Sequence, residues 1–253
     1  LIVFFTIVLL PSLFVALPAF EALFTDTFSA AISGSGVWTN YWQSLLVSYL
    51  LGALVTLIGF VVGLPMAILI ARKKFGGAIS TVLDVLINVP LIVPSIALGV
   101  SLKFFWQSFA FIPEFILLVF AHLTITYPYI VRSISAAFER ISIDIEDAAR
   151  TLGAKPFDVF RTIMLPLTKY SILSGAIMVF TRSVSETGAT LAVVTNLQTA
   201  PVVIVNWVKA LQNAGLNTSI TASMVGLGCG IPIVFSFIIL LLLRLITRGK
   251  GRY

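Results

Sequence analysis

The hydrophobic positions of this chain gather in six long stretches, with polar positions between them. A helix needs roughly 20 apolar residues to cross the ~30 Å hydrocarbon layer of a bilayer, and each stretch is close to that length. We therefore predict an all-helical integral membrane protein, with one transmembrane domain over residues 1–253 and six membrane spans. The expected spans are about 1–23, 44–71, 83–105, 115–131, 167–194 and 222–246.

Two of these stretches carry residues that shape a helix. Gly59 and Gly63 stand four positions apart in the second stretch, a spacing that favours close contact with another helix. Pro90 and Pro94 predict that the third stretch is bent or locally unwound. Bent backbone at membrane depth is tolerated where it is buried in protein or lines an aqueous path. The third stretch is thus a candidate wall of such a path.

Two segments outside the spans contain aromatic residues. Residues 24–42 read as an outer loop that ends in Trp38, Tyr41 and Trp42, a cluster typical of the aromatic belt at a membrane surface. Residues 199–211 begin with a proline at a first-turn position and contain a Trp and a Lys. They predict an interfacial or re-entrant helix.

Composition and charge support a membrane protein. The chain is 59% hydrophobic and 10% charged, with a mean hydropathy of +1.09, which excludes a soluble globular domain. A pI near 9.7 would suggest a nucleic-acid partner in a soluble chain, but here the basic residues flank apolar spans. All of the 16 Lys and Arg residues except Lys103, Arg182 and Lys209 fall on one predicted side. The positive-inside rule makes that side the cytoplasm, with both termini and the central loop.

The start of the sequence adds a smaller expectation. The chain begins at Leu1 without a Met or a basic segment. We expect a few cytoplasmic residues before it, and we do not interpret the first stretch as a cleaved signal peptide.

Residues 140–166 form the one long interval that carries charge at short spacing. Ser142 or Asp144 can cap a helix whose first turn is acidic. Gly153 suits the residue that follows the end of this helix, and Pro156 suits the first turn of a second one. The interval therefore predicts two short helices joined by a bend.

Small side chains mark one face of the first of these helices. Ala148 and Ala149 are followed one turn later by Leu152. Such a face is flat and can approach another backbone closely, which favours docking of a second protein over catalysis.

The same interval resembles a known family. Asp147-Ala148-Ala149, then Gly153, Ile163 and Leu165-Pro166 at matching spacing, is similar to the cytoplasmic EAA loop of the permease subunits of ATP-binding-cassette (ABC) importers. This chain departs from the pattern at Asp147, where Glu is usual, and Glu146 offers that charge one position early.

The resemblance implies the type I importer permease fold and a coupling helix that sits in a groove of the ATPase subunit. The residues to which it assigns ATPase coupling are Glu146, Asp147, Ala148, Ala149, Leu152, Gly153, Ala154, Lys155 and Pro156.

The fifth stretch contains the densest group of polar residues inside a span. Arg182 and Glu186 are four positions apart and can form an ion pair on one helix face, with Ser183, Thr187 and Thr190 on an adjacent stripe. Two interpretations stay open. The group is either a polar wall or gate of a substrate path, or a self-neutralised pair that holds helices together.

The segment Ser185 to Thr190 resembles the one found at this place in molybdate, tungstate and sulfate permeases. A tetrahedral oxyanion is bound by hydroxyl, amide or helix-terminus donors rather than by a metal. Candidates for the translocation path or gate are Asn88, Ser95, Arg182, Ser183, Ser185, Glu186 and Thr187, among which Asn88, Ser95, Ser183, Ser185 and Thr187 are the candidate anion donors.

Other polar residues favour ordinary roles. His122 is the only histidine, and one imidazole in a span is more often a packing hydrogen bonder than a ligand. Cys229 is the only cysteine and suits packing. The sequence shows no Walker motif and no nucleophile elbow. We therefore expect a transport subunit that is not an enzyme and holds no metal or cofactor, with ATP and Mg bound by a separate ATPase subunit.

The resemblance implies a permease subunit of the inner (cytoplasmic) membrane that moves molybdate, tungstate or sulfate by alternating access. The implied partners are a second permease copy, two ABC ATPase subunits, an extracytoplasmic substrate-binding protein and membrane lipid. Phosphate, ferric iron and thiamine remain alternative substrates. A proton-coupled carrier, or an intramembrane enzyme using Arg182, Glu186 or His122, are alternatives of other classes.

Overall fold

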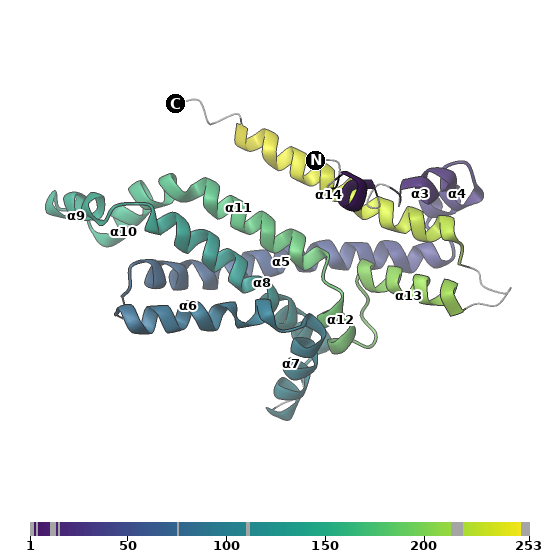
Figure 1. Ribbon diagram of the computed structural model, residues 1–253, viewed down its shortest axis with the longest axis horizontal. Coiled ribbons are helices and arrows are strands. Elements are labelled where there is room, and N and C mark those ends of the chain that lie inside the picture. Colours follow the sequence, from purple (N-terminus) through teal and green to yellow (C-terminus); the bar gives the residue numbers. More distant parts are fainter. Residues whose placement is uncertain are drawn as a thin grey trace. The chain divides into compact units, whose positions relative to one another are not determined.

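The computed structural model describes residues 3, 5–10, 14, 16–74, 76–109, 112–213 and 220–248, and within these ranges all regular secondary structure is helical (Figure 1). This confirms the all-helical fold class. The chain divides into two compact units, Leu50–Asn196 on the one hand and Leu1–Tyr49 with Leu197–Tyr253 on the other. Helix α5 (Val37–Ala71) runs through the boundary.

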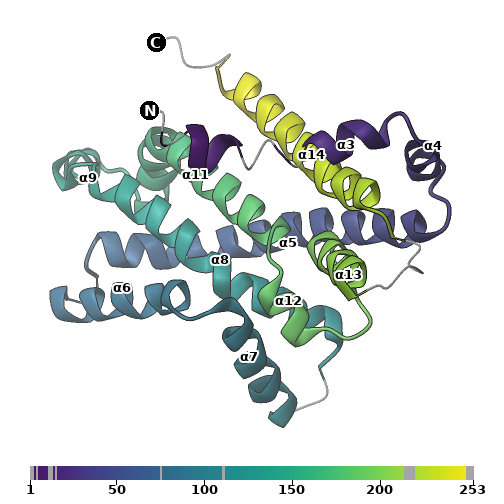
Figure 2. The same ribbon diagram turned by 45° about the vertical axis from the view of Figure 1, so that its right-hand side comes forward.

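The unit Leu50–Asn196 contains both segments to which the sequence assigns function. Besides the second part of α5, its elements are α6 (Gly77–Ile92), α7 (Ser95–Phe109), α8 (Glu114–Glu139), α9 (Ile143–Thr151), α10 (Pro156–Val159), the π-helical turn η2 (Phe160–Met164), α11 (Leu165–Val184) and α12 (Gly188–Val193). Helices α8 and α11 lie side by side, with α6 along α8, and α9 and α10 connect α8 to α11 beyond their ends (Figures 1 and 2).

Small residues explain why α8 sits at the centre of this unit. A Cβ atom added at Gly63 of α5 would lie 2.9 Å from the Ile130 side chain of α8, and one added at Gly175 of α11 would lie 2.9 Å from Cβ of Ser133. Ser133 also donates a 2.8 Å hydrogen bond to the carbonyl of Ser171 in α11. The predicted close contact through Gly63 is thus confirmed, and α8 is packed on two sides.

The third expected span is broken, as its prolines predicted. Helix α6 ends at Ile92, α7 begins at Ser95, and the two meet at a bend of 109° (Figure 1). Pro94 lies in the break and has no N–H group with which to continue a helix.

The fifth expected span, 167–194, is also two helices rather than one. Helix α11 ends at Val184, and α12 begins at Gly188. The Glu186 carboxylate accepts a 3.1 Å hydrogen bond from the Ala189 backbone N–H and thereby satisfies a free donor of the new helix. The break therefore has its own local stabilisation.

The described residues contain four helices that are long and apolar enough to cross a membrane, or five if α6 and α7 together form one span. Residues 1, 2, 4, 11–13 and 15 of the first expected span lie outside the described residues, and the elements described in this stretch are η1 (Phe5–Leu9) and α3 (Ala16–Ala22). The first span therefore stays a prediction.

The second unit is built around an aromatic core. Its remaining helices are α4 (Asp26–Ser33), α13 (Ala200–Asn213) and α14 (Ala222–Arg248). Trp38 and Tyr41 of α5 are fully buried against Trp207 of α13, and the Tyr41 hydroxyl donates a 2.6 Å hydrogen bond to the Gly228 carbonyl of α14. The expected aromatic belt is therefore wrong for these two residues, because α13 covers them.

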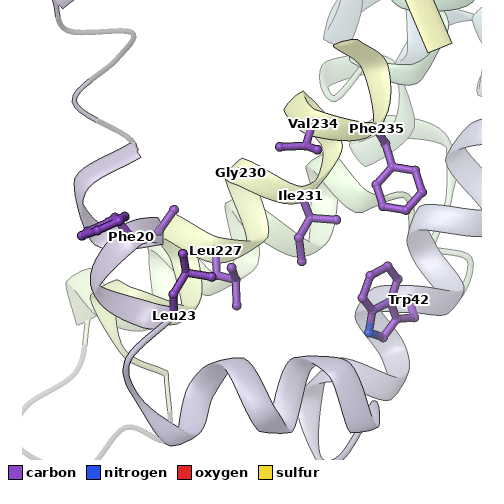
Figure 3. A pocket seen from close by; sticks show the side chains of 9 residues that line it. Phe20, Leu23, Trp42, Leu227, Gly230, Ile231, Val234 and Phe235 are labelled. Atoms are coloured by element: carbon purple, nitrogen blue, oxygen red, sulfur yellow. The ribbon is translucent and has the colours of Figure 1, made fainter. Parts of the chain in front are cut away.

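The predicted helix over residues 199–211 is present as α13. The Ser48 hydroxyl of α5 accepts a 2.8 Å hydrogen bond from the Ala200 N–H and so caps the start of α13. This unit also contains an apolar cavity of about 360 Å³ (Figure 3), lined by Ala19, Phe20, Leu23, Trp42, Leu227, Gly230, Ile231, Val234 and Phe235.

Candidate functional site

The loop between α8 and α11 has the local structure that its sequence predicts. The Ser142 hydroxyl accepts a 3.2 Å hydrogen bond from the Asp144 N–H at the start of α9. At the other end, Gly153 has φ 89°, a left-handed conformation that glycine adopts without steric cost. The N–H groups of Gly153 and Ala154 donate to the carbonyls of Arg150 and Ala149 at 2.9 and 3.1 Å, the two bonds of a Schellman motif.

The second helix of the loop continues into the membrane. Pro156 occupies the first turn of α10, and α10, η2 and α11 follow one another without a gap from Pro156 to Val184. The loop is therefore joined to α11 by continuous helix.

Two large apolar side chains of the loop are exposed to solvent. Leu152 is 89% exposed and Phe157 is 68% exposed, although both are large and hydrophobic. Ala148 is exposed and Ala149 half-buried beside them. Exposed apolar residues next to small ones, outside the expected membrane spans, mark a surface on which a protein partner can dock.

Glu146 and Asp147, which are neighbours in the loop, have different environments. The Glu146 carboxylate forms an ion pair with Arg72 at the end of α5 and a longer one, 3.8 Å, with Arg150. Asp147 is exposed and has no ion pair within 4.0 Å among the residues that the structure describes. The Asp147 carboxylate is therefore free to meet a partner, whereas the Glu146 carboxylate binds arginines of the same chain.

Arg72 joins three elements at this end of the unit. Its side chain is 8% exposed and donates to the Ile141 carbonyl after α8 at 3.2 Å and to the Met164 sulfur of η2 at 3.9 Å, in addition to its ion pair with Glu146 of α9. From the sequence, Arg72 indicated only which side of the membrane the end of α5 faces. Nothing local in Arg72-Lys73-Lys74 distinguishes the first residue from the other two, since its partners come from distant segments.

At the break between α11 and α12, the expected ion pair is present. Nη2 of Arg182 lies 2.7 Å from Oε2 of Glu186, whose side chain is only 2% exposed. The Glu186 carboxylate thus binds Arg182 with one oxygen and the backbone of α12 with the other.

His122 of α8 connects the two helices on either side of this break. Its Nδ1 lies 2.9 Å from the hydroxyl of Ser183 in α11, and its Nε2 lies 2.8 Å from the hydroxyl of Thr190 in α12. All three side chains are buried. The predicted role of His122 as a packing hydrogen bonder is confirmed, and no group of three or more His, Cys, Asp or Glu within the described ranges could hold a metal ion.

Glycine allows the start of α7 to reach the same place. A Cβ atom added at Gly188 would lie 2.5 Å from the Ser95 hydroxyl, and one added at Gly99 would lie 2.8 Å from the Ala189 backbone. The break between α6 and α7 and the break between α11 and α12 therefore meet, with α8 beside them (Figure 2).

The structure brings most of the predicted path residues together and leaves one apart. Ser95, Ser183, Glu186 and Arg182 gather at the two breaks, and Ser185 and Thr187 lie between α11 and α12 with their side chains exposed and half-buried. Asn88 lies elsewhere on α6, where its Oδ1 accepts a 3.3 Å hydrogen bond from Nη1 of Arg132 in α8. Sequence reasoning missed this partner of Asn88.

A family model described as the binding-protein-dependent transport system inner membrane component matches residues 59–250, which include both regions described above. The chain belongs to this family. It is thus a permease component of an ABC importer, a transport subunit rather than an enzyme, and the predicted function class is confirmed. Proteins of this family reside in the membrane and work with other components of the transport system.

Individual relatives agree in their described substrate. The molybdate/tungstate transport system permease protein of Pyrococcus furiosus is 30% identical over 240 residues, which cover 94% of this chain and 91% of the relative. The protein of the same description from Pyrococcus abyssi is 31% identical and covers 78% of each chain. The molybdenum transport system permease protein of Escherichia coli K12 is 33% identical over 62% of this chain and 73% of its own length.

Proposed function

We propose that this permease moves a tetrahedral oxyanion, molybdate or tungstate with sulfate as a related candidate, into the cell. The observation that carries this proposal is the likeness to permeases described for molybdate and tungstate, one of them along 94% of the chain. The Ser185–Thr190 segment, which prompted the same substrate class from the sequence, forms the break at which α7, α8, α11 and α12 meet.

We further propose that residues 140–166 couple this movement to ATP hydrolysis by a separate ATPase subunit. The exposed Leu152 and Phe157 and the free Asp147 support a docking surface. The residues assigned to it are Glu146, Asp147, Ala148, Ala149, Leu152, Gly153, Ala154, Lys155 and Pro156, with Glu146 acting through Arg72. The continuous helix from Pro156 to Val184 supports transmission of force to the break.

The proposed assembly contains two copies of this chain, two ABC ATPase subunits and an extracytoplasmic binding protein, in the inner membrane with both termini in the cytoplasm. Closure of the ATPase subunits on ATP would move the two loops and switch the path between inward-open and outward-open states. Asn88, Ser95, Ser185 and Thr187 supply accessible donors along the path, and Arg182, Ser183 and Glu186 hold the backbone at the break.

Uptake by the complete transporter tests the substrate. Proteoliposomes that contain this chain, its ATPase subunits and its binding protein are supplied with labelled tungstate, molybdate, sulfate or phosphate. We expect ATP-dependent uptake of tungstate and molybdate, with sulfate slower. Uptake of phosphate alone, or uptake of tungstate that follows a proton gradient without ATP, would contradict the proposal.

Labelling of single cysteines tests the orientation. Cys229 is the only cysteine, so a Cys229→Ser chain provides the background. A Lys155→Cys substitution in the loop should react with a membrane-impermeant maleimide in inside-out vesicles and not in intact cells. A Ser35→Cys substitution in the expected outer segment is the matched control and should show the reverse pattern. Labelling of Lys155→Cys from outside the cell would show that the loop does not face the cytoplasm, and the ATPase subunits could then not bind it.

A further inference from the structure

Polar side chains occur on α6 and α8 far from the basic turn that ends α5. Asn88 is eleven residues into α6, so at 1.5 Å per residue it lies about 16 Å from the start of this helix, near half the thickness of a ~30 Å hydrocarbon layer. Arg132 lies beside it in α8, seven residues or about 10 Å before the helix ends at Glu139. The hydrogen bond from Arg132 to Asn88 therefore lies in the second half of the candidate span Glu114–Glu139, which extends past residue 131, where the sequence predicted that the span ends.

The charge of Arg132 is not neutralised by its surroundings. No Asp or Glu carboxylate lies within 4.0 Å of its guanidinium in the described part of the chain. Its one hydrogen bond there, from Nη1, goes to the uncharged Asn88 amide. Arg182 of α11 differs in this respect because Glu186 neutralises it at 2.7 Å.

Arg132 also lies on the surface of the single chain, where its side chain is exposed. An unpaired arginine that faces lipid within a span costs free energy, although less toward the end of the span, where its side chain can reach the headgroup region. Such a residue faces the interior of an assembly or a water-filled path instead. The remaining N–H groups of the guanidinium are free to donate to an anion there, in the planar fork that suits oxyanions.

We propose that Arg132 is an anion-contacting residue of the translocation path, held in position by the Asn88 amide, and that its ligand is a divalent tetrahedral oxyanion. The proposal rests on the proposed function, since an oxyanion supplies the missing negative charge. Asn88 is a positioning residue: its Oδ1 accepts from Arg132, and its Nδ2 donates to the Asp84 carbonyl one turn earlier on α6. Transient pairing with Arg132 lowers the cost of bringing a dianion to membrane depth.

Thiol protection tests whether an oxyanion reaches this place. Ala136 is exposed one turn after Arg132 on α8, so an Ala136→Cys substitution in the Cys229→Ser chain reports on the surroundings of Arg132 without removing it. The complete transporter is treated with a small uncharged methanethiosulfonate, with tungstate or with sodium chloride of equal ionic strength. We expect tungstate to slow labelling at least threefold, and the effect to disappear when Arg132→Gln is added.

Each other result of this experiment counts against the proposal. A thiol that does not react shows that this face of α8 is closed to water. Equal protection with and without Arg132 shows that the guanidinium does not contact the anion, and absence of protection in both shows that no anion comes near.

Transport rates provide the second measurement. We expect Arg132→Gln to lower the maximal rate of tungstate uptake at least tenfold and Arg132→Lys to restore part of it, because a lysine keeps the charge. Asn88→Leu should have an intermediate effect. Lys74→Gln, a charge removal at an exposed position after the end of α5 and outside the coupling loop, is the matched control and should retain the wild-type rate.

Asp84 offers a competing explanation, in which a second copy of the chain places this carboxylate beside Arg132. In that case an Asp84→Asn, Arg132→Gln double variant would recover transport, and the proposal would be overturned. We expect the double variant to be no faster than Arg132→Gln alone. Uptake of tungstate by the wild-type transporter distinguishes a wrong substrate from a wrong role of Arg132. If the wild type takes up no tungstate, the proposed substrate is rejected. If the wild type takes it up and the Arg132→Gln variant does so at the same rate, only the role of Arg132 is rejected.

Discussion

Two arginine–glutamate pairs lie in the two candidate functional regions of this permease component, the loop 140–166 and the break between α11 and α12, and they are built in opposite ways. Arg182 and Glu186 are one helical turn apart, and their ion pair bridges the end of α11 and the approach to α12. Arg72 and Glu146 come from segments far apart in sequence, and their pair ties the end of α5 to α9 of the loop. The first pair stabilises a local break, whereas the second holds separate elements together.

The difference separates a fixed region from one suited to move. At the break, the Glu186 carboxylate and the His122 hydrogen bonds are buried, and Gly188 lies in close contact with Ser95. At the loop, one buried arginine holds elements whose other side chains, such as Leu152, are exposed. We infer that a partner protein that binds the loop moves it together with Arg72 and α11. The break between α11 and α12 keeps its structure during this movement.

The sharpest test of this contrast is a charge on the docking face. Ala149→Glu should reduce uptake about a hundredfold, because an unpaired charge buried in a protein interface costs on the order of 3 kcal/mol. ATP hydrolysis should no longer follow substrate, while the amount of inserted subunit stays the same on quantitative immunoblots. Ala78→Glu, the same change at an exposed position at the start of α6, is the control and should leave uptake intact. Normal uptake by Ala149→Glu would reject the docking face.

The next test breaks the long-range pair. Arg72→Met should lower the free energy of unfolding by about 3 kcal/mol, because it leaves the Glu146 carboxylate without its buried partner. Thermal unfolding of the purified protein measures this change, and the ratio of ATP hydrolysed to anion transported should rise. The Arg72→Met, Glu146→Met double variant should regain much of the stability. A double variant as unstable as the single one would show that the ion pair is not the cause.

The two partners of the Arg182–Glu186 ion pair should differ in how much their removal destabilises the protein. Arg182→Gln leaves a 2% exposed carboxylate unpaired, whereas Glu186→Gln leaves an arginine that is 36% exposed and can be hydrated. We therefore expect Arg182→Gln to lower the unfolding temperature more than Glu186→Gln does. The reverse order would mean that the bond from Glu186 to the Ala189 N–H matters more than its charge.

The smallest effect is expected at the turn of the loop. A Cβ atom at Gly153 meets nothing within 4 Å, but φ 89° is unfavourable for any other residue. Gly153→Ala should therefore cost about 1–2 kcal/mol of local strain without a packing clash. We expect uptake to fall more than the unfolding temperature, since the strain distorts the docking helix. Gly76→Ala, which also has positive φ and open space but lies outside the loop, is the control.

The features that could be predicted from the amino-acid order are those whose cause lies within a few residues. The cap at Ser142, the Schellman turn at Gly153, the proline start of α10 and the Arg182–Glu186 pair all follow from short-range hydrogen bonds and spacing. The bend near Pro94 has a similarly local origin. Hydropathy alone gave the membrane class, because the bilayer requires long apolar helices.

Packing between distant segments decided the rest. Trp38 and Tyr41 look like residues of a membrane surface until α13 covers them. Arg72 differs from its basic neighbours only through its contacts with Glu146, Ile141 and Met164. Likewise, His122 gained its partners Ser183 and Thr190 only when the broken fifth segment folded against α8. Such contacts depend on which helices become neighbours, and the order of residues within each helix does not contain that information.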